Sequence, residues 1–258
     1  MVVTNDDGIS APGLDVLVRA FQAEGETPSV VAPSRQRSLC GHSMTLGRPV
    51  RLEPVDRWNG VRSWQCDGTP TDCVILAFDG LGLSDGTVFS GINDGANLGD
   101  DVTYSGTVAA AMEACLTGRQ AVAVSVVTPV GQPAVHYETA GAVAVAVFRQ
   151  LRKSPLPGGV FLNVNVPDCP KDELAGIKIC HQGQRVYRYG GMIRRHEENE
   201  TGVSFWLEGR PHDEPQPGCE LWAIGRRCAA VTPLGLKFTH GAALEQLRAG
   251  WDLEAMME

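Results

Sequence analysis

The chain begins with MVVTNDDGISAPGLDVLVRAFQAEG (residues 1–25), and this stretch decides the fold that we expect. Its first four residues are typical of a short buried strand. Apolar side chains then recur at Leu14, Leu17 and Phe21, which is the spacing of one helical face. The pattern ends at Gly25, and glycine is common just beyond a helix. A short strand followed directly by an amphipathic helix is the first unit of an alternating α/β fold.

The same order of strand, loop and helix is repeated up to about residue 130. Buried strands are expected at 28–34, 87–93 and 121–127, and helices are expected to begin at Thr69 and Ser105. Because these strands are apolar almost without interruption, we predict a Rossmann-like, mostly parallel sheet with helices on both faces. Binding sites in such sheets form beyond the carboxyl ends of the strands, so the loops that follow the strands become the candidates.

The sequence changes character beyond residue 168, where charged and proline-rich loops separate shorter apolar runs. We therefore predict a Rossmann-like catalytic core at residues 1–168 and a smaller β-rich region at residues 169–258. The second region is expected to pack on the core, to carry a protruding hairpin used in oligomerisation, and to end in a helix. Within the core, residues 43–55 are expected to form a hairpin.

The composition limits the partners that the protein can have. Its 258 residues carry a net charge of −8, and Lys and Arg form no long run, so nucleic acid is not an expected partner. The chain has neither a secretion-type leader nor an apolar run of about 18 residues, from which we expect a cytoplasmic protein without membrane contact. Its eight cysteines include no C-x-x-C pair and are expected to be reduced.

Polar side chains gather in the loops that follow the first buried strands. Asp6 and Asp7 come directly after the first strand, where Gly8 allows an unusual backbone angle that turns both carboxylates to one point. The later loops add hydroxyl, imidazole and amide groups at Ser38, His42, Ser43, Asn93 and Asn97. Two carboxylates with neutral oxygen donors favour a hard cation such as Mg²⁺, Mn²⁺ or Ca²⁺. An acidic turn that only caps the next helix is the alternative.

The helix start at Ser105, Gly106 and Thr107 is a second candidate feature. Ser105 is a natural N-cap, and the free backbone N–H groups and dipole at a helix N terminus favour an anion. An ordinary cap is the alternative for this tripeptide taken alone. Beside a metal site, however, the helix start is suited to hold a phosphate that the cation polarises, which indicates a phosphate-processing hydrolase.

Five motifs of the chain resemble, in this order and spacing, those of the SurE family of metal-dependent survival-protein phosphatases, the stationary-phase 5'-nucleotidases. The motifs are TNDDGISAPGLDVL (4–17), VVAPSRQRSLCGHSMTL (30–46), GTPTDCV (68–74), SGINDGANLGDDVTYSGTVAAAMEA (90–114) and LNVNVP (162–167). The resemblance runs over nearly the whole chain. Departures from the family pattern, such as Cys219 and Glu220 in place of Thr and Asp, lie outside the expected metal shell.

The resemblance implies a role for each matching residue. It implies that one divalent cation, Mg²⁺ or Mn²⁺ (or Ca²⁺ in a crystal), is held by Asp6, Asp7, Ser38 and Asn93. It implies that the phosphate pocket is lined by Asn97, Ser105, Gly106 and Thr107. It also implies hydrolysis of nucleoside 5'-monophosphates, with some activity on 3'-nucleotides and short polyphosphate, and a homodimer or homotetramer that exchanges C-terminal segments.

These expectations lead to a metal-dependent phosphomonoesterase of the 5'-nucleotidase type as the leading hypothesis. The candidates for catalytic groups are Asp6, Asp7 and His42. Histidine titrates near neutral pH and suits a general acid for the leaving alkoxide, although a His42 that only braces its loop is the alternative. Two other classes remain open: a nucleotide-binding regulatory module with little turnover, and a different metal hydrolase. The latter would need a His-x-x-His pair, which the chain does not contain.

Overall fold

The computed structural model describes residues 1–84, 86–129, 131–187, 193–199, 202–207 and 211–251. The strands are β1 (Val2–Thr4), β2 (Ser29–Pro33), β3 (Leu52–Pro54), β4 (Ser63–Cys66), β5 (Val88–Asp94), β6 (Ala121–Val127), β7 (Val160–Pro167), β8 (Gly176–Ile179), β9 (Gln184–Tyr187), β10 (Ile193–Asn199), β11 (Gly202–Leu207), β12 (Pro211–Glu214) and β13 (Cys228–Gly235). The α-helices are α1 (Pro12–Ala23), α2 (Pro70–Ile75), α3 (Gly106–Leu116), α4 (Tyr137–Lys153), α5 (Glu220–Ile224) and α6 (Gly241–Gly250). Shorter helical segments are η1 (Leu76–Gly80), η2 (Gly99–Thr103) and η3 (Lys171–Glu173).

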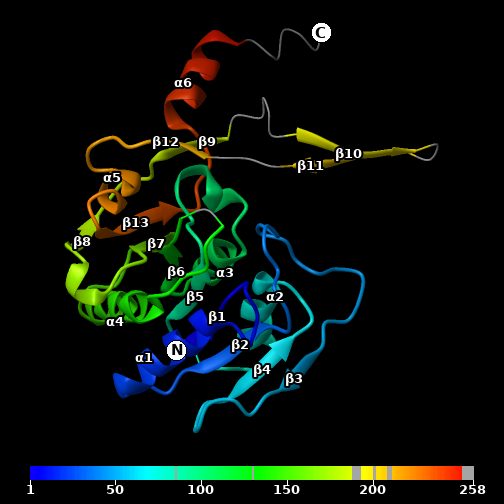
Figure 1. Ribbon diagram of the computed structural model, residues 1–258, viewed down its shortest axis with the longest axis vertical. Coiled ribbons are helices and arrows are strands. Elements are labelled where there is room, and N and C mark those ends of the chain that lie inside the picture. The colour runs from blue at the N-terminus through cyan, green and yellow to red at the C-terminus, as the bar shows by residue number, and fades with distance from the viewer. Residues whose placement is uncertain (85, 130, 188–192, 200–201, 208–210, 252–258) are drawn as a thin grey trace.

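Among the described residues, nine strands form one sheet in the order β3-β4-β2-β1-β5-β6-β7-β13-β8 (Figure 1). The strands from β4 to β7 in this order are parallel to one another, which confirms the predicted, mostly parallel sheet. β3 and β13 run antiparallel to β4 and β7. The chain first builds outward from β1 through β2 and β4, and then returns to the other side of β1 to form β5. The β1–β5 boundary is therefore the topological switch point, where sheets of this kind bind ligands.

Helices cover both faces of this sheet, as predicted. On one face α1 packs against α4, and the rings of Phe21, Phe89 and Phe148 meet edge to face with centroids 4.7, 5.6 and 6.1 Å apart. On the other face α2 packs against α3, whose alanines at 109–111 are buried against the sheet. Because these side chains are small, α3 lies close to β5 and β6. The N terminus of α3 is thereby brought to the carboxyl edge of the sheet.

The segment between β2 and α2 differs from the sequence interpretation. The hairpin expected at residues 43–55 is wrong, because only Leu52–Pro54 of this segment is a strand. This strand pairs with β4, which the sequence interpretation missed. Side chains hold the remaining loop instead of a ladder, since both the N–H and the hydroxyl of Thr45 donate to the carboxylate of Asp72. Asp72 also forms a capping box with Thr69, at which the helix was expected to begin.

Beyond residue 168 the chain both extends the main sheet and leaves it. β13 and β8 continue the sheet beyond β7, whereas β9 pairs with β12 and β10 pairs with β11 in two antiparallel ribbons. Figure 1 shows the β10–β11 ribbon extending to one side of the molecule. The β-rich C-terminal region is confirmed, the boundary at residue 168 stays a prediction, and residues 252–258 lie outside the described part. Within the described chain, we find no helix that combines the length and the apolar character of a membrane span.

Candidate active site

The chain turns sharply after β1, and the side chain of Asn5 closes the turn. Its Nδ2 donates to the carbonyl of Gly8 (2.9 Å), and its Oδ1 accepts the N–H of Gly8 (3.2 Å). Gly8 has a φ of +100°, in the left-handed region that only glycine adopts readily. The loop after β2 is tied to the same turn, because the N–H of Arg37 donates to the carbonyl of Asp6 (2.7 Å). Asp6 and Asp7 therefore lie on a turn that is braced from two sides.

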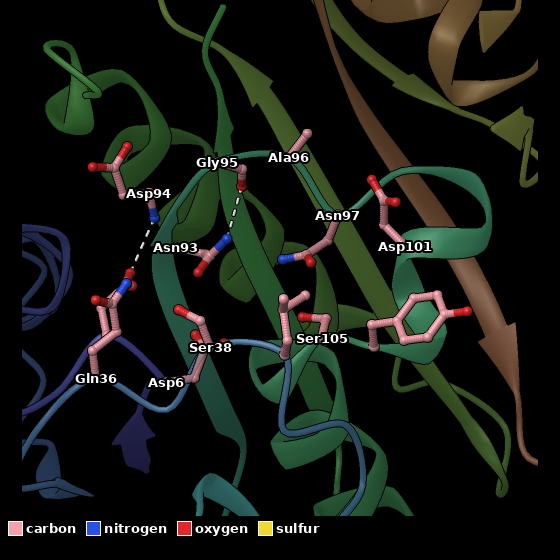
Figure 2. A pocket seen from close by; sticks show the side chains of 13 residues that line it. Asp6, Gln36, Ser38, Asn93, Asp94, Gly95, Ala96, Asn97, Asp101 and Ser105 are labelled. Carbon is pink, nitrogen blue, oxygen red and sulfur yellow. Dashed lines mark hydrogen bonds between the residues drawn. The ribbon is translucent and has the colours of Figure 1, made fainter. Parts of the chain in front are cut away.

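An open cavity of about 480 Å³ lies next to this turn, at the carboxyl ends of β1, β2 and β5. It is walled by the loops that follow these strands and by the start of α3 (Figure 2). Six of the residues predicted for the site line it, namely Asp6, Asp7, Ser38, Asn93, Asn97 and Ser105. The structure thus brings together side chains from three loops that are far apart in the sequence.

Asp6 lies at the bottom of the cavity and is 5% exposed. The hydroxyl of Thr107 donates to its Oδ1, and Gly106 packs so closely that an added Cβ there would lie 2.9 Å from the Cβ of Asp6. Burial raises the pKa of the Asp6 carboxyl, and the hydroxyl of Thr107 and nearby backbone amides only partly oppose this effect. A buried carboxylate of this kind is stabilised by a positive charge at the cavity.

Asp7 is less deeply buried and stands beside Asp6. Its Oδ2 accepts the N–H of Asp94 (3.1 Å), and Gln36 donates to its Oδ1 over 3.5 Å. Burial, followed by repulsion from the Asp6 carboxylate, raises the pKa of Asp7 to about 6. Two neighbouring carboxylates that repel each other in this way favour either a shared proton or a bound cation.

Ser38 and Asn93 add neutral oxygens beside the two carboxylates. The Nδ2 of Asn93 donates to the carbonyl of Gly95 (2.8 Å), and the Oδ1 of Asn93 points away from Gly95, to the side of Ser38 (Figure 2). This donor set consists only of hard oxygens, which suits Mg²⁺ or Mn²⁺. In the described part of the chain, no group of three or more His, Cys, Asp and Glu side chains is placed to hold a metal ion.

Asn97 is buried and is fixed by side chains from two neighbouring strands. Its N–H donates to Oδ1 of Asn165 (2.9 Å), and its carbonyl accepts the Nδ2 groups of Asn163 (2.8 Å) and Asn165 (2.9 Å). Its own Nδ2 donates one hydrogen to the hydroxyl of Ser125 (2.7 Å). An amide nitrogen carries two donor hydrogens, so the second one is left to the cavity.

The residues at the start of α3 have two different roles. Ser105 lines the cavity and caps the helix, since its Oγ accepts the N–H of Val108 (3.1 Å). Gly106 and Thr107, which were expected to face a phosphate, lie behind Asp6 instead and do not line the cavity. The free end of the helix therefore supports the carboxylate of Asp6, and only Ser105 faces the cavity.

His42 is separated from the cavity that contains the aspartates. Its Nε2 lies 2.8 Å from Oε2 of Glu113 on α3. The ring lines a second cavity, of about 540 Å³, which shares Ser105 with the first. The pairing with Glu113 favours the alternative in which His42 braces its loop.

Comparison with known proteins identifies the family of the chain. A family described as survival protein SurE matches residues 1–189, which is most of the chain. The chain belongs to the SurE family. A relative from Pelobacter propionicus named 5'-nucleotidase SurE is 43% identical over 248 residues, covering 95% of this chain and 96% of the relative. Another of that name, from Geobacter sulfurreducens, is 43% identical over 257 residues, covering 99% of this chain and 94% of the relative.

The fold comparison also points to SurE. The crystal structure of the SurE protein from Aquifex aeolicus matches with a TM-score of 0.80 and 31% sequence identity, over 96% of this chain and 98% of that one. The match includes the region beyond residue 168, so the C-terminal strands are part of the shared SurE architecture. The α/β fold with a β-rich C-terminal region is therefore confirmed.

The sequence analysis missed several residues at or next to this cavity. Asp94, Asp101 and Tyr104 also line the cavity, but they lie in a polar loop in which nothing separates them from other solvated residues. The sequence gives a clearer signal for polar residues within otherwise apolar, buried strands, namely Ser125, Asn163 and Asn165. Asn163 and Asn165 are two residues apart and hence point to the same face of β7.

Proposed function

We propose that the protein is a divalent-metal-dependent phosphomonoesterase that hydrolyses nucleoside 5'-monophosphates to a nucleoside and phosphate. The charge of the cavity carries this proposal. Four aspartates line it, Asp6, Asp7, Asp94 and Asp101, and only Asp101 is paired with an arginine, Arg185, among the residues that the structure describes. The described part of the lining includes no Lys, Arg or His. A phosphate monoester is itself an anion and would be repelled by these walls. A phosphate is therefore accepted here only when a cation is bound between it and the aspartates.

The residues that fit the cation are Asp6, Asp7, Ser38 and Asn93. A divalent cation bound by them would supply positive charge to the phosphoryl oxygens and lower the pKa of a bound water. The chain itself provides the orientation: Thr107 holds the carboxylate of Asp6, and Asp94 holds that of Asp7 through its backbone N–H. Asn97 presents an N–H donor and Ser105 a hydroxyl to the same cavity, where they suit the oxygens of a phosphate.

The relatives give the proposal its substrate class. Curated SurE relatives that align over almost the whole chain are named 5'-nucleotidase. Nucleoside 5'-monophosphates are accordingly the expected substrates, and 3'-nucleotides and short polyphosphate are proposed as weaker ones. All eight cysteines are free, which suits the reducing cytoplasm as the site of action.

Release of inorganic phosphate from AMP and GMP tests this function. The protein is first freed of metal with EDTA and then assayed alone, with Mg²⁺ and with Mn²⁺. Gln120→Ala is a matched control, because Gln120 precedes β6 at the opposite edge of the sheet and makes two hydrogen bonds to Leu156. We expect turnover only with metal, in both proteins. Turnover of the metal-free protein would contradict the mechanism, and tight nucleotide binding without hydrolysis under any metal would favour the regulatory module.

We further propose that the protein forms a homodimer or homotetramer through its C-terminal region. β11 exposes four large apolar side chains, with Val203 44%, Phe205 50%, Trp206 51% and Leu207 82% exposed. Phe238 and Trp251, on either side of α6, are 83% and 63% exposed. Such clusters are typical of surfaces that are covered by a partner. Sedimentation of the intact protein and of a Phe205→Ser/Trp206→Ser variant tests this, and a monomeric wild-type protein would contradict it.

A further inference from the structure

One wall of the cavity is the short helical segment η2 and the residues around it. η2 (Gly99–Thr103) lies between Asn97, which is fixed by β6 and β7, and Ser105, which caps α3. Asp101 and Tyr104 of this wall line the cavity. Figure 2 shows Asp101 on one side of the cavity and Asp6, Ser38 and Asn93 on the other. This wall and the aspartates therefore face the same cavity from different sides.

Gly99, the first residue of the wall, is held on both sides of its backbone by the C-terminal region. Its N–H donates to Oε1 of Glu220 over 2.6 Å, and its carbonyl accepts Nε2 of Gln182 over 2.8 Å. Its φ is +55°, and an added Cβ would lie 2.7 Å from the Cβ of Arg185. The backbone at Gly99 is thus packed directly on the segment that leads into β9.

The side chain of Glu220 connects the wall to the C-terminal region. It is the first residue of α5 and is 0% exposed. Besides Gly99, its Oε1 accepts the N–H of Gly183 (3.4 Å), and its Oε2 accepts the hydroxyl of Thr232 on β13 (2.9 Å). Burying a carboxylate is costly unless its oxygens are hydrogen-bonded, and here both oxygens are. The side chain therefore links three separate segments at one buried point.

Arg185 fixes the same wall at a second point. Its side chain is only 12% exposed and its NH1 donates to Oδ2 of Asp101 (2.8 Å), while its Nε and NH2 groups donate to Asp213 on β12 (2.7 and 3.0 Å). The wall of the cavity is thus anchored to α5 through Glu220 and to the β9–β12 ribbon through Arg185. The loop with Ser38 also meets this wall, because the N–H of Gly41 donates to the carbonyl of Tyr104 (3.0 Å). Among the described residues, the turn with Asp6 and Asp7 makes no hydrogen bond to Glu220, Gln182 or Arg185.

We propose that Glu220 is a positioning residue, which through Gly99 sets the wall that receives the nucleoside part of the substrate. The inference rests on the proposed function, because it assigns a role in nucleotide binding to a residue that touches neither the metal site nor the phosphate. The two ends of the substrate are thereby assigned to different parts of the protein. The phosphate end depends on the aspartate turn, and the nucleoside end depends on a contact made by the C-terminal region.

Glu220→Ala tests the proposal. It leaves the N–H of Gly99 without its acceptor, so the wall moves, and we expect the KM for AMP to rise about tenfold. The inhibition constant of inorganic phosphate should stay within about twofold, because Asn97 and Ser105, which suit the phosphate oxygens, are held by Asn165 and by the N–H of Val108 and not by Glu220. A variant that is merely less stable has fewer folded molecules, which lowers kcat and leaves KM unchanged. An unchanged KM would therefore overturn the inference.

If Glu220→Ala does not fold, two further variants test the same role. Glu220→Gln retains an oxygen for the N–H of Gly99 and can donate to the hydroxyl of Thr232, so it should restore the wild-type KM. Gln182→Ala removes the exposed partner of the Gly99 carbonyl and should raise the KM for AMP in the same direction. Gln120→Ala, at the opposite edge of the sheet, is the control and should leave the KM for AMP unchanged. A Gln182→Ala variant with the wild-type KM would count against the proposal.

Hydrogen exchange gives a readout that does not need turnover. Glu220→Ala should speed the exchange of amides in residues 98–104 and leave residues 5–10 unchanged, and Glu220→Gln should exchange as the wild type does. If the wild-type protein releases no phosphate, the proposed function fails and this measurement alone decides the inference. Equal exchange of residues 98–104 in all three proteins would overturn it.

Discussion

The hydroxyl of Thr107, in the first turn of α3, donates a hydrogen bond to Oδ1 of Asp6, at the end of β1. This contact joins a helix start to a loop that precedes it by about a hundred residues. Gly106 allows it, because any larger residue there would collide with Asp6. The carboxylate is therefore held in one orientation before any ligand arrives.

Thr107→Val should weaken the binding of the activating metal. Valine has nearly the same shape but no donor, so Oδ1 of Asp6 loses its partner and the carboxylate its fixed orientation. A hydrogen bond to a charged group contributes about 1.5–3 kcal/mol, which corresponds to a loss of affinity of about tenfold or more. Titration of the metal-free protein with Mn²⁺ measures this loss. Thr107→Ser is the matched control and should bind the metal as the wild type does; equal affinities for all three proteins would contradict this role.

The metal-free protein should lose stability as the pH rises from about 4 to above 6. The pKa of the Asp7 carboxyl is raised from 3.8 to about 6 in the folded protein, so the folded state holds more protons than the unfolded state in this window. The free energy of unfolding then falls with rising pH, and Asp6 contributes in the same direction. Urea unfolding in the presence of EDTA at several pH values measures this slope.

Asp7→Asn should remove much of this slope and make the metal-free protein more stable at pH 7.5. The gain is expected to be on the order of 1–2 kcal/mol after solvent screening, because the variant no longer places two carboxylates side by side. The same variant should lose most of its phosphatase activity. Asp56→Asn, at an exposed aspartate, is the control and should change neither property. A less stable Asp7→Asn protein at pH 7.5 would show that the repulsion is unimportant.

Asn165→Ala should lower both stability and activity. Asn97 would lose the acceptor of its N–H and one of the two donors to its carbonyl, which leaves buried polar groups unpaired at a cost of about 1–3 kcal/mol. Because Asn97 faces the cavity, we also expect kcat/KM for AMP to fall by tenfold or more. Asn163→Ala removes only the second donor and should have a smaller effect on both measurements. The reverse order of the two variants would contradict this assignment.

The sequence predicted the sheet well because its central strands are buried on both faces and hence apolar throughout. β1, β2 and β6 show this pattern directly. β4 was missed because Trp64 and Gln65 are only half-buried in a strand near the edge, so the segment carries no such signal. The segment at 43–55 resembled a hairpin, but Thr45 bonds to Asp72 of α2 and Leu52–Pro54 pairs with β4. No pattern within the segment could reveal these partners.

The site was predictable where a residue follows its strand directly, as Asp6 and Asp7 follow β1. The start of α3 was harder to interpret. A helix N terminus that receives a phosphate and one that receives the carboxylate of its own chain have the same sequence, and only the structure shows Thr107 on Asp6. The role of Asn163 and Asn165 could not be predicted from the sequence either, because their partner Asn97 lies in a loop that is far from β7 in the sequence.

His42 and Glu113 form a pair whose role can be decided by comparing the two residues. Their side chains are 2.8 Å apart, and His42 lines a cavity separate from that of the aspartates. From this position we expect His42→Gln to lower kcat less than tenfold, well short of the roughly 100-fold or larger loss that follows removal of a general acid. Glu113→Gln should have an effect of similar size, because both changes loosen the same contact. The pH profile of kcat provides the decisive measurement. A His42 variant that loses the alkaline limb of this profile and about 100-fold in kcat, beside a Glu113 variant that keeps both, would instead assign proton transfer to His42.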